Sequence, residues 1–486
     1  MQNSLSRIIG SDGVMTGEAG LLKVTGITSD SRKVKPGNLF VAIPGGTTDG
    51  ATYIADARKR GAAAVAGLPG LIKGTGPFIE TDNPRLLLAR AAARFYGRQP
   101  DIIAAVTGTN GKTSVSVFMR QIWEAMGFRA ASIGTIGVIS PDGLQEATHT
   151  TPDPAELHET LAQLADADVG HLAIEASSHG LSQYRLHGLR LTCAGFTNLT
   201  QDHLDYHASM DDYFLAKMKL FDELLPQGAT AVINMDSAFG SSVRDRCLAN
   251  GQRVFTVGRN GIDLRIISTQ GENLGQVVIV ETRTGMHEIS LPLAGDFQVS
   301  NALVAAGLVI ASGGEESLVL HALESLKGAP GRLDLVGQAA SGAPVFVDYA
   351  HTPDALENVL RTLRPLAKRK LAVVFGCGGD RDAGKRPMMG KVAVELADRA
   401  YVTDDNPRTE DAAKIRSQIM VAAAGAEEIG NRADAIFKAT QELQEGDVLL
   451  VAGKGHEQGQ IIGTEKRPFS DHEAVRRAIR GEHYHG

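Results

Sequence analysis

The segment with the clearest chemical potential reads Gly108-Thr109-Asn110-Gly111-Lys112-Thr113. Its two glycines would let the backbone turn its N–H groups toward an anion, and a helix starting near Thr113 would point its positive dipole end at the same place. Lys112 would reach the β and γ phosphates of a nucleotide, and the Thr113 hydroxyl would hold Mg²⁺. Val106 stands where the pattern G-x-x-x-x-G-K-[ST] has its first glycine, so a glycine-rich turn that binds nothing is an alternative here.

Three further side chains in the segments after this loop could carry chemistry. Glu175 ends an apolar run, where a carboxylate could hold Mg²⁺ directly or through water. His203 lies in a polar segment and could bind metal or phosphate. Lys217 falls on the apolar stripe of a helix capped by Ser209, and a lysine on a buried face needs an acidic partner, a bound anion or a chemical modification. A salt-bridged glutamate, a loop histidine and a snorkelling lysine are the alternatives.

Four polar loops follow apolar runs in the last third of the chain, at residues 348–351, 376–382, 404–408 and 453–457. In an open α/β sheet, ligands bind outside the carboxyl ends of the strands, so these loops predict a binding surface. Arg381 and Arg408 could bind a carboxylate, while Asp405 and Glu457 could bind an ammonium group. A ligand with both charges, an amino acid, would match this set. Surface charges in ordinary loops are the alternative.

These groups must be positioned by the elements that precede them. Apolar strands alternate with helical segments, which predicts an α/β fold with parallel, doubly wound sheets. Residues 1–98 are expected to form a small α/β domain, residues 99–330 a nucleotide domain and residues 331–486 a further α/β domain. Residues 253–293 should form antiparallel strands joined by turns at Gly271 and Gly285. Strands are expected at residues 39–43, 102–106, 130–133, 171–174, 194–196, 229–233, 344–347, 371–375, 400–403 and 448–451, and helices at about residues 53–60, 83–96 and 299–312.

Composition narrows the classes of function. A chain of 486 residues with 43% hydrophobic and 22% charged residues is typical of a globular protein with several domains. A net charge of -7 argues against binding to a nucleic-acid backbone. The three cysteines are far apart and imply neither a disulfide framework nor a zinc site. No apolar run approaches a membrane span and no leader-like segment opens the chain, so we expect a cytoplasmic protein without membrane partners.

Taken together, the motifs resemble those of the ATP-dependent Mur ligases of peptidoglycan synthesis. The resemblance spans nearly the whole chain and is highly specific in combination. His149, Gln298 and Ser470 depart from the usual residues of the family, which affects fine contacts and not the chemistry. The matching segments are residues 29–32, 108–113, 150–152, 175–181, 202–205, 331–332, 348–351, 376–386, 405–408 and 453–457, with Gln183, Arg185 and Asn301.

The resemblance implies a small N-terminal α/β domain for the UDP-sugar, a central P-loop mononucleotide-binding parallel sheet for ATP, and a C-terminal Rossmann-like domain for the amino acid. It implies ATP-dependent, Mg²⁺-assisted ligation by a monomer. Meso-2,6-diaminopimelate would be joined, through an acyl phosphate, to the D-glutamyl γ-carboxylate of UDP-N-acetylmuramoyl-L-alanyl-D-glutamate. Arg408 would read the distal carboxylate, which L-lysine lacks. The same ligation with L-lysine, a folylpolyglutamate-synthase-like activity and a nucleotide-switched binding protein are the alternatives.

The resemblance also assigns roles to individual residues. Catalysis would use Lys112, Glu175, His203 and Lys217, and the metal would be held by Thr113, Glu175, His203 and a carbamate on Lys217 (N6-carboxylysine). ATP would be bound by residues Gly108 to Thr113 together with Asn301, Arg332 and Asp348. The UDP-sugar peptide would be bound by Ser29, Ser31, Gly46, Thr47, Thr48, His149, Thr150, Thr151, Ser177, Gln183 and Arg185. Diaminopimelate would be bound by Arg381, Asp405, Asn406, Pro407, Arg408, Gly453 and Glu457.

Overall fold

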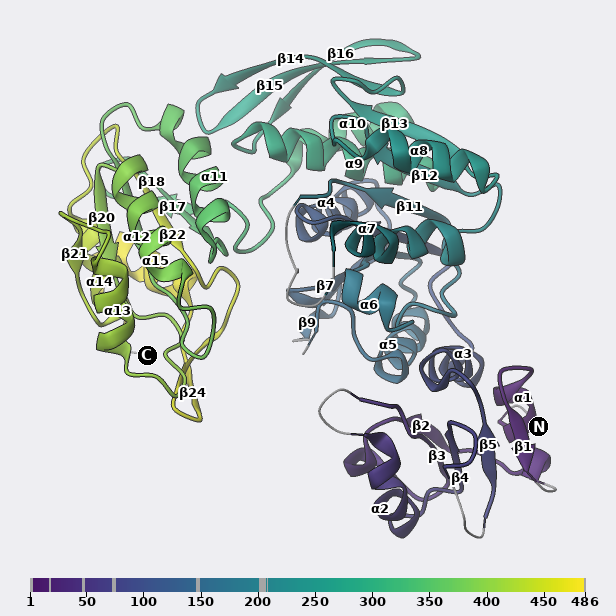
Figure 1. Cartoon of the computed structure of the whole chain (residues 1–486). Helices are drawn as coiled ribbons and strands as arrows, with labels where there is room; N and C mark the ends of the chain where they lie inside the picture. The colour runs from purple at the N-terminus through teal and green to yellow at the C-terminus, as the bar shows by residue number, and fades with distance from the viewer. Residues whose placement is uncertain are drawn as a thin grey trace. The chain divides into compact units, whose positions relative to one another are not determined.

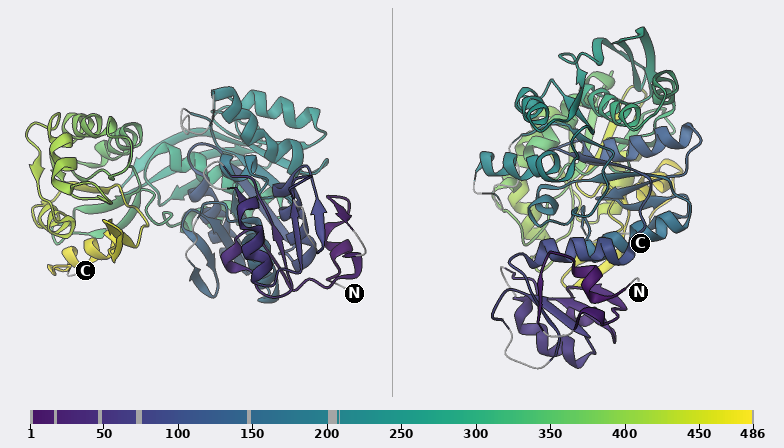
Figure 2. Two further views of the ribbon diagram at one scale, coloured as in Figure 1. Left: turned by 60° about the horizontal axis from the view of Figure 1, so that its bottom comes forward. Right: turned by 90° about the vertical axis from the view of Figure 1, so that its right-hand side faces the viewer.

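The computed structural model describes residues 3–16, 19–45, 49–71, 76–145, 149–200, 207 and 209–484. These residues form helices and largely parallel sheets (Figure 1, and from two further sides Figure 2). The chain divides into two compact units. The first comprises residues 1–266, 281–286 and 300–322, and the second comprises residues 267–280, 287–299 and 323–486. The division into three ligand-binding domains stays a prediction. Across the described ranges, no helix is long and apolar enough to cross a membrane.

The first unit opens with a five-stranded sheet of order β1-β5-β4-β3-β2, in which only the pairing of β1 is antiparallel. Helix α3 (Pro84–Tyr96) is capped by Asn83, whose side chain accepts a hydrogen bond from the Leu86 N–H, and it ends at Gly97 in the left-handed conformation. The α3 helix packs against α5 (Pro154–Asp166). The other elements are α1 (Leu5–Ile9), α2 (Ile54–Lys59), β1 (Val14–Thr16), β2 (Gly26–Thr28), β3 (Asn38–Val41), β4 (Ala64–Gly67) and β5 (Phe78–Glu80).

A larger sheet in the first unit has β6 (Ile102–Thr107) at its centre, between β10 (His171–Glu175) and β11 (Cys193–Phe196). All three strands are parallel and almost completely buried, as their continuous apolar runs predict. The order β13-β12-β11-β6-β10-β7-β8-β9 is parallel as far as β7, and β8 and β9 form an antiparallel edge. The remaining elements are α4 (Lys112–Ala125), α6 (Ser178–Ser182), α7 (Met210–Lys219), α8 (Gly240–Ala249), α10 (Glu316–Ala322), β7 (Ala130–Gly134), β8 (Gly137–Ser140), β9 (Gly143–Gln145), β12 (Thr230–Asn234) and β13 (Arg253–Gly258).

The interpretation of residues 253–293 was partly wrong. The first strand, β13, is parallel to β12 and continues the main sheet. The strand β14 (Leu264–Glu272) runs through Gly271, and the turn comes at residues 273–274, where Asn273 adopts a left-handed conformation. The strands β15 (Gly275–Thr282) and β16 (Gly285–Leu291) follow, with Gly285 opening β16, and α9 (Asp296–Ala311) begins three residues earlier than predicted. A half-exposed strand has the same alternating pattern whether its neighbour is parallel or antiparallel. Tertiary packing, and not the pattern, decides the direction of the neighbour.

The second unit contains a sheet of order β17-β18-β22-β19-β20-β21, parallel except for β17. Alternate residues of its strands enter two separate cores: Leu371, Val373 and Phe375 pack with α11, α12 and α13, while Ala372 and Val374 pack with α14 and α15. Helices therefore cover both faces, which confirms the doubly wound α/β fold. The elements are β17 (Asp334–Gln338), β18 (Pro344–Asp348), α11 (Pro353–Leu363), β19 (Leu371–Phe375), α12 (Lys385–Leu396), β20 (Arg399–Val402), α13 (Ala412–Met420), β21 (Glu427–Glu428), α14 (Arg432–Gln441), β22 (Val448–Ala452), β23 (Gly459–Ile462), β24 (Glu465–Pro468) and α15 (Asp471–Ile479).

A buried histidine gives the first unit a pH-dependent stability. His158 on α5 is 1% exposed, and its Nε2 lies 3.1 Å from the His187 carbonyl oxygen. Burial lowers the pKa of His158 to about 4. The unfolded chain binds this proton near pH 6.5, so the native state binds fewer protons between the two values. Stability should therefore fall as the pH drops from 6.5 to 4, by on the order of 3 kcal/mol from this group alone.

Denaturant unfolding between pH 7 and pH 4 would measure this dependence. His158→Gln keeps a donor for the carbonyl and should give a flatter slope than the unchanged chain. His321→Gln, which changes an exposed histidine, is the matched control. Equal slopes for all three proteins would show that His158 does not titrate in this way.

Candidate active site

The phosphate loop has the predicted strand–loop–helix form. It joins β6 to α4, and Gly108 and Gly111 have φ angles of +153° and +87°. A Cβ atom at residue 108 would lie 1.9 Å from the Thr197 hydroxyl oxygen, so this position requires glycine. The Lys112 ammonium donates to the carbonyl oxygens of Gly108 and Thr109, both at 2.8 Å. The loop therefore presents a helix N-terminus with a lysine held across it, which suits a phosphate group.

The loop is fastened to the polar residues that follow β11. The Thr197 hydroxyl donates to the Asn110 carbonyl at 2.6 Å, and the Asn198 side-chain oxygen accepts from the Asn110 N–H at 2.9 Å. The Thr109 N–H donates to the Asn198 carbonyl at 2.9 Å. This anchorage fixes the loop before any ligand binds. This anchorage was not predicted, although the polar pair Thr197 and Asn198 directly after a neighbouring strand was a usable signal.

Asn301, predicted on the ATP side, lies against the phosphate loop. A Cβ atom at residue 111 would be 2.2 Å from the Asn301 side-chain oxygen, so the absence of a side chain at Gly111 makes room for it. Asn301 lies on α9 and is 6% exposed. Its amide thus belongs to the wall of the loop, as expected of an ATP-binding residue, although its role remains a prediction.

Glu175 lies one strand away from the loop and is held by a residue that the sequence analysis missed. It pairs in register with Val106 of β6 and is 1% exposed. Its Oε1 accepts from the Thr135 N–H at 2.8 Å, and its Oε2 accepts from the Thr135 hydroxyl at 3.2 Å. A Cβ atom at Gly134 would lie 1.9 Å from Oε1, so glycine is needed there. A buried carboxylate with spare lone pairs is a suitable magnesium ligand.

Lys217 occupies the buried face of α7, as its position on the apolar stripe predicted. The side chain is 1% exposed, its Nζ donates to the Gly108 carbonyl at 2.8 Å, and it lies 4.2 Å from the centre of the Tyr213 ring. The Tyr213 hydroxyl donates to Thr109 Oγ1 at 3.3 Å, which ties the helix to the phosphate loop. Ser209 caps α7 by accepting from the Asp212 N–H. The predicted Lys217 site is thus adjacent to the predicted phosphate site.

The residues present fit a magnesium ion beside this loop only in part. Among the residues that the structure places, no group of three or more His, Cys, Asp or Glu side chains could hold a metal. Glu175 and the Thr113 hydroxyl supply two oxygen donors of the hard type that Mg²⁺ prefers. A carbamate on Lys217 would supply a third. His203, the fourth predicted ligand, lies outside the described residues.

A cavity of about 200 Å³ in the first unit collects several residues predicted to bind the UDP-sugar peptide. Its wall includes Ser29, His149, Gln183 and Arg185, all of which were predicted. The Arg185 guanidinium donates to the Thr151 carbonyl at 2.7 Å and to the Gln183 side-chain oxygen at 2.8 Å. These contacts fix a cation at the cavity wall, where it can meet an anionic ligand.

Two further cavity residues were missed. Arg85, in the first turn of α3, donates to the Pro44 carbonyl at 3.0 Å. Asp153 caps α5 and accepts from the Ser29 hydroxyl at 3.3 Å, and burial raises the pKa of its carboxyl group. Arg85 could have been proposed from its residue type, because guanidinium groups commonly bind anionic substrates.

The other described residues that were predicted to bind the UDP-sugar peptide do not line this cavity. Ser31 is 7% exposed and opens a short 3₁₀ turn outside the cavity lining. Thr150 lies 3.1 Å from Thr135 through their hydroxyl oxygens, and the Thr151 hydroxyl donates to the Glu175 carbonyl at 2.9 Å. Ser177 caps α6 and lies 2.9 Å from the Thr151 hydroxyl. Thr150, Thr151 and Ser177 are thus linked by hydrogen bonds to Glu175 and Thr135. Gly46, Thr47 and Thr48 lie outside the described residues.

In the second unit, the four predicted loops follow the carboxyl ends of the adjacent parallel strands β18, β22, β19 and β20. Asn406 is at the centre of a buried network: its side-chain oxygen accepts from Lys454 Nζ at 3.0 Å, and its amide nitrogen donates to Glu457 Oε2 at 2.9 Å. Lys454, which is fully buried and was not predicted, also donates to Glu457 at 2.9 Å. Asp405 is 8% exposed, and a Cβ atom at Gly453 would lie 2.9 Å from its Oδ2.

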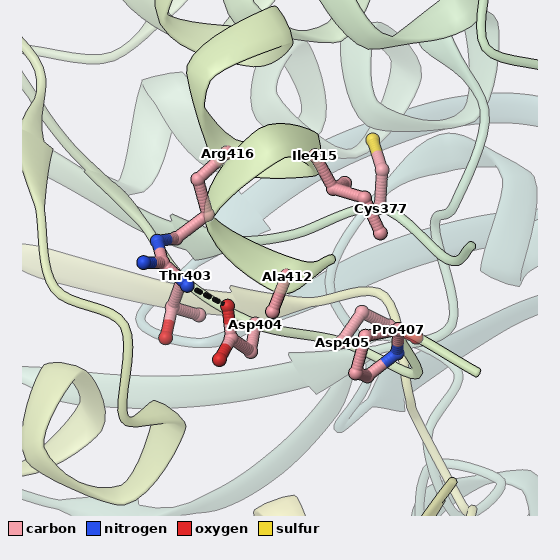
Figure 3. A pocket seen from close by; sticks show the side chains of 8 residues that line it. All are labelled: Cys377, Thr403, Asp404, Asp405, Pro407, Ala412, Ile415 and Arg416. Carbon is pink, nitrogen blue, oxygen red and sulfur yellow. Dashed lines mark hydrogen bonds and ion pairs between the residues drawn. The ribbon is translucent and has the colours of Figure 1, made fainter. Parts of the chain in front are cut away.

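The two predicted arginines of this surface differ in their contacts. Arg408 has a left-handed φ of +52°, and its Nη1 donates to the Gly379 carbonyl at 2.7 Å. Arg381 is exposed. Pro407 lines a small pocket with Cys377, Asp404, Asp405 and Arg416 (Figure 3). In that pocket Asp404 forms an ion pair with Arg416, so this carboxylate serves the packing of α13 and is separate from Asp405.

The residues of the second unit that were predicted to bind ATP lie at the end of β18, for Asp348, and just before β17, for Arg332. The Asp348 carboxylate accepts from the N–H groups of Leu333 and Ala350, at 2.6 and 2.7 Å, and burial raises its pKa. The Arg332 guanidinium lies 4.9 Å from the centre of the Tyr349 ring. Gln298, one of the departures from the family pattern, donates to the Arg332 carbonyl at 3.3 Å, and Ser470, another, caps α15. Both departures thus have structural roles.

Comparison with known proteins agrees with this geometry. Residues 23–96 match the catalytic domain of the Mur ligase family, residues 106–309 the Mur ligase middle domain and residues 331–455 the glutamate ligase domain of Mur ligases. Proteins named UDP-N-acetylmuramoyl-L-alanyl-D-glutamate–2,6-diaminopimelate ligase are similar: that of Mesorhizobium japonicum is 56% identical, covering 94% of this chain and 95% of the relative, and that of Brucella melitensis is 55% identical, covering 95% of each. A solved structure of the same name is 32% identical, with a TM-score of 0.74 and 99% of both chains covered. The chain therefore belongs to the Mur ligase family.

Proposed function

We propose that the chain is an ATP-dependent ligase that joins meso-2,6-diaminopimelate to the D-glutamyl γ-carboxylate of UDP-N-acetylmuramoyl-L-alanyl-D-glutamate. The observation that carries the proposal is the 56% identity, over 94% of the chain, to a relative named for these two substrates. The phosphate loop, the cavity with Arg85 and Arg185 and the Asp405–Arg408 loop would each bind one reactant, which supports the proposal. A cytoplasmic location and a monomeric state remain predictions.

The proposed division of labour assigns residues 1–98 to the UDP-sugar, residues 99–330 to ATP and residues 331–486 to the amino acid. Each range contains one of the three matched family segments, at residues 23–96, 106–309 and 331–455. The cavity with Arg85 and Arg185 lies in the first compact unit together with the phosphate loop. The reactive carboxylate and the phosphate donor would therefore be bound by neighbouring parts of one unit.

In the proposed reaction, an oxygen of the γ-carboxylate attacks the γ-phosphorus of ATP, and ADP leaves. The diaminopimelate amine then attacks the acyl carbon, phosphate leaves, and the nitrogen loses a proton to give the amide. Lys112 and the N–H groups of the phosphate loop would stabilise the charge on the transferring phosphoryl group. Thr113, Glu175, His203 and carbamylated Lys217 would hold Mg²⁺, which when bound supplies further positive charge to the phosphate oxygens.

The choice of amino acid would depend on the loops of the second unit. Arg408 offers a guanidinium group for the distal carboxylate, and Arg381 is a second cation. Asp405 and Glu457 would bind the ammonium group, although Asp405 Oδ1 already accepts from the Asn406 N–H at 2.7 Å and Glu457 already accepts from Lys454. Asn406, Gly453 and Pro407 would shape the site around these charges. L-lysine lacks the distal carboxylate and would leave the Arg408 guanidinium without an anionic partner.

Phosphate release from ATP tests the proposal. With UDP-N-acetylmuramoyl-L-alanyl-D-glutamate present, release should require diaminopimelate, and L-lysine should replace it poorly. Arg408→Lys should lower kcat/KM for diaminopimelate by about 10²-fold, because a charged two-pronged contact is replaced by a single ammonium group. Arg361→Lys, on the exposed face of α11, is the matched control. Release that ignores the amino acid would favour the nucleotide-switched binding protein, and equal use of L-lysine would favour the lysine ligase.

A further inference from the structure

Arg386 is a buried cation that lies outside the predicted site. It stands in the first turn of α12 and is 1% exposed. Its guanidinium forms a bidentate pair with the Glu410 carboxylate, in which Nη2 donates to Oε1 at 2.8 Å and Nη1 donates to Oε2 at 2.9 Å. It also donates to the Gln418 side-chain oxygen at 2.6 Å and to the Gly378 carbonyl at 3.2 Å. A buried guanidinium is costly without such partners, so this arrangement holds the three partner groups in fixed positions.

Glu410 connects Arg386 to two of the loops predicted to bind the amino acid, at residues 376–382 and 404–408. It lies two residues after Arg408, and its Oε1 also accepts from the Asp380 N–H at 2.6 Å. The Asp380 carboxylate in turn accepts from the Thr409 N–H at 3.1 Å and from the Thr409 hydroxyl at 2.7 Å. The hydrogen bonds from Arg386 lower the pKa of Glu410 to about 2, so its charge persists at neutral pH. Residues 378–380 are thereby fastened to residues 409–410.

The fastened loops contact the Arg408 side chain. Its backbone is also held, because the Arg408 N–H donates to the Ile461 carbonyl at 3.0 Å and the Gly463 N–H donates to the Arg408 carbonyl at 2.6 Å. The Arg408 guanidinium donates to the Gly379 carbonyl, and the Gly379 N–H donates to the Asn406 carbonyl at 2.9 Å. A Cβ atom at Gly379 would lie 1.9 Å from the Pro407 carbonyl oxygen, so the two loops are in close contact. Arg408 also has a left-handed backbone, which is uncommon for a residue with a long side chain and needs surrounding contacts to hold it.

We propose that Arg386 and Glu410 are positioning residues that orient Arg408 toward the distal carboxylate of diaminopimelate and so help to select the amino acid. Neither residue touches the substrate in this role. The inference rests on the proposed function, because it takes Arg408 as the group that reads the carboxylate. Its alternative is an ion pair that stabilises the second unit without affecting selection.

The test compares Glu410→Gln and Arg386→Lys with the unchanged chain. Glu410→Gln keeps the size and one acceptor oxygen but loses the charge, so it is the variant expected to fold. Both should raise KM for diaminopimelate, by about 10-fold to 10²-fold, because a small displacement of a positioning group has effects of this size. The ratio of kcat/KM for diaminopimelate over L-lysine should fall, while KM for ATP and for the UDP-sugar peptide should not change. The charge reversal Arg386→Glu with Glu410→Arg should recover part of the ratio.

A matched control separates positioning from stability. Asp398→Asn removes a carboxylate that pairs with Arg364 and accepts from the Leu371 N–H, at the opposite end of β19 from the loops. It should lower Tm and leave the amino-acid ratio unchanged. Variants of Arg386 and Glu410 that lower Tm but keep the ratio would overturn the inference, and so would an equal change in the ratio for Asp398→Asn. An unchanged chain that does not ligate diaminopimelate would instead contradict the proposed function.

Discussion

Replacing Lys112 by methionine should lower kcat by about 10³-fold or more, equivalent to about 4 kcal/mol of transition-state stabilisation. The ammonium group is held by the carbonyl oxygens of Gly108 and Thr109, so it lies across the mouth of the phosphate loop. In the proposed reaction its charge acts on a phosphoryl group that gains negative charge as the bond to ADP breaks. Methionine keeps an unbranched side chain of similar length and removes the charge together with the N–H donors to Gly108 and Thr109, so the fold should be retained.

Phosphate release and nucleotide binding would be measured together. The variant should bind ATP more weakly and show no turnover with both other substrates present, while its circular dichroism and Tm stay close to those of the unchanged chain. Arg120→Met, which removes a cation from the same helix, is the control and should stay active. An active Lys112→Met protein would contradict the proposed mechanism.

The arrangement of the sheets could be predicted because buried parallel strands are continuous apolar runs. Residues 371–375 were predicted as a strand with the bounds that the structure shows, and residues 102–106 and 448–451 each needed one further residue. The error at residues 253–293 has a physical cause. The half-exposed β13 shows a pattern that fits a parallel or an antiparallel partner. Its parallel pairing with β12 follows from the helix α8 that joins the two strands.

The candidate site could be predicted where a single segment carried the signal. The burial of Lys217 followed from its spacing to Tyr213 and Leu220, and the structure leaves it 1% exposed. Contacts between separate loops could not be read in this way. Thr135 and Glu175 are 40 residues apart, Arg386 and Glu410 are 24 apart, and neither local pattern indicates the other partner. Glu457 stays predicted as a ligand for the ammonium group, but the sequence of its loop did not indicate that Lys454 would be fully buried beside it.

Replacing Lys217 by alanine should also lower kcat, by about 10²-fold to 10³-fold. The side chain is almost fully buried, and burial favours the neutral amine over the ammonium form. The neutral nitrogen can attack the carbon of CO₂, form an N–C bond and lose one proton, which leaves a carbamate with a single negative charge. In the unmodified chain the Lys217 nitrogen lies 2.8 Å from the Gly108 carbonyl oxygen. The N–H that remains in the carbamate can still donate to this oxygen, so the modification keeps the observed contact. An anionic oxygen pair would then stand beside the phosphate loop, where a magnesium ligand is needed.

Lys219 provides the matched control for this prediction. It lies two residues further along α7, with its side chain 27% exposed and 3.8 Å from Glu223. Protein equilibrated with carbon-13 bicarbonate should give a carbamate signal by nuclear magnetic resonance in the unchanged chain and in Lys219→Ala, and none in Lys217→Ala. Activity should fall in CO₂-free buffer and return with bicarbonate. An active protein without that signal would mean that Lys217 works as an ammonium group, and the magnesium site would then need a different third oxygen donor, because Glu175 and Thr113 supply only two.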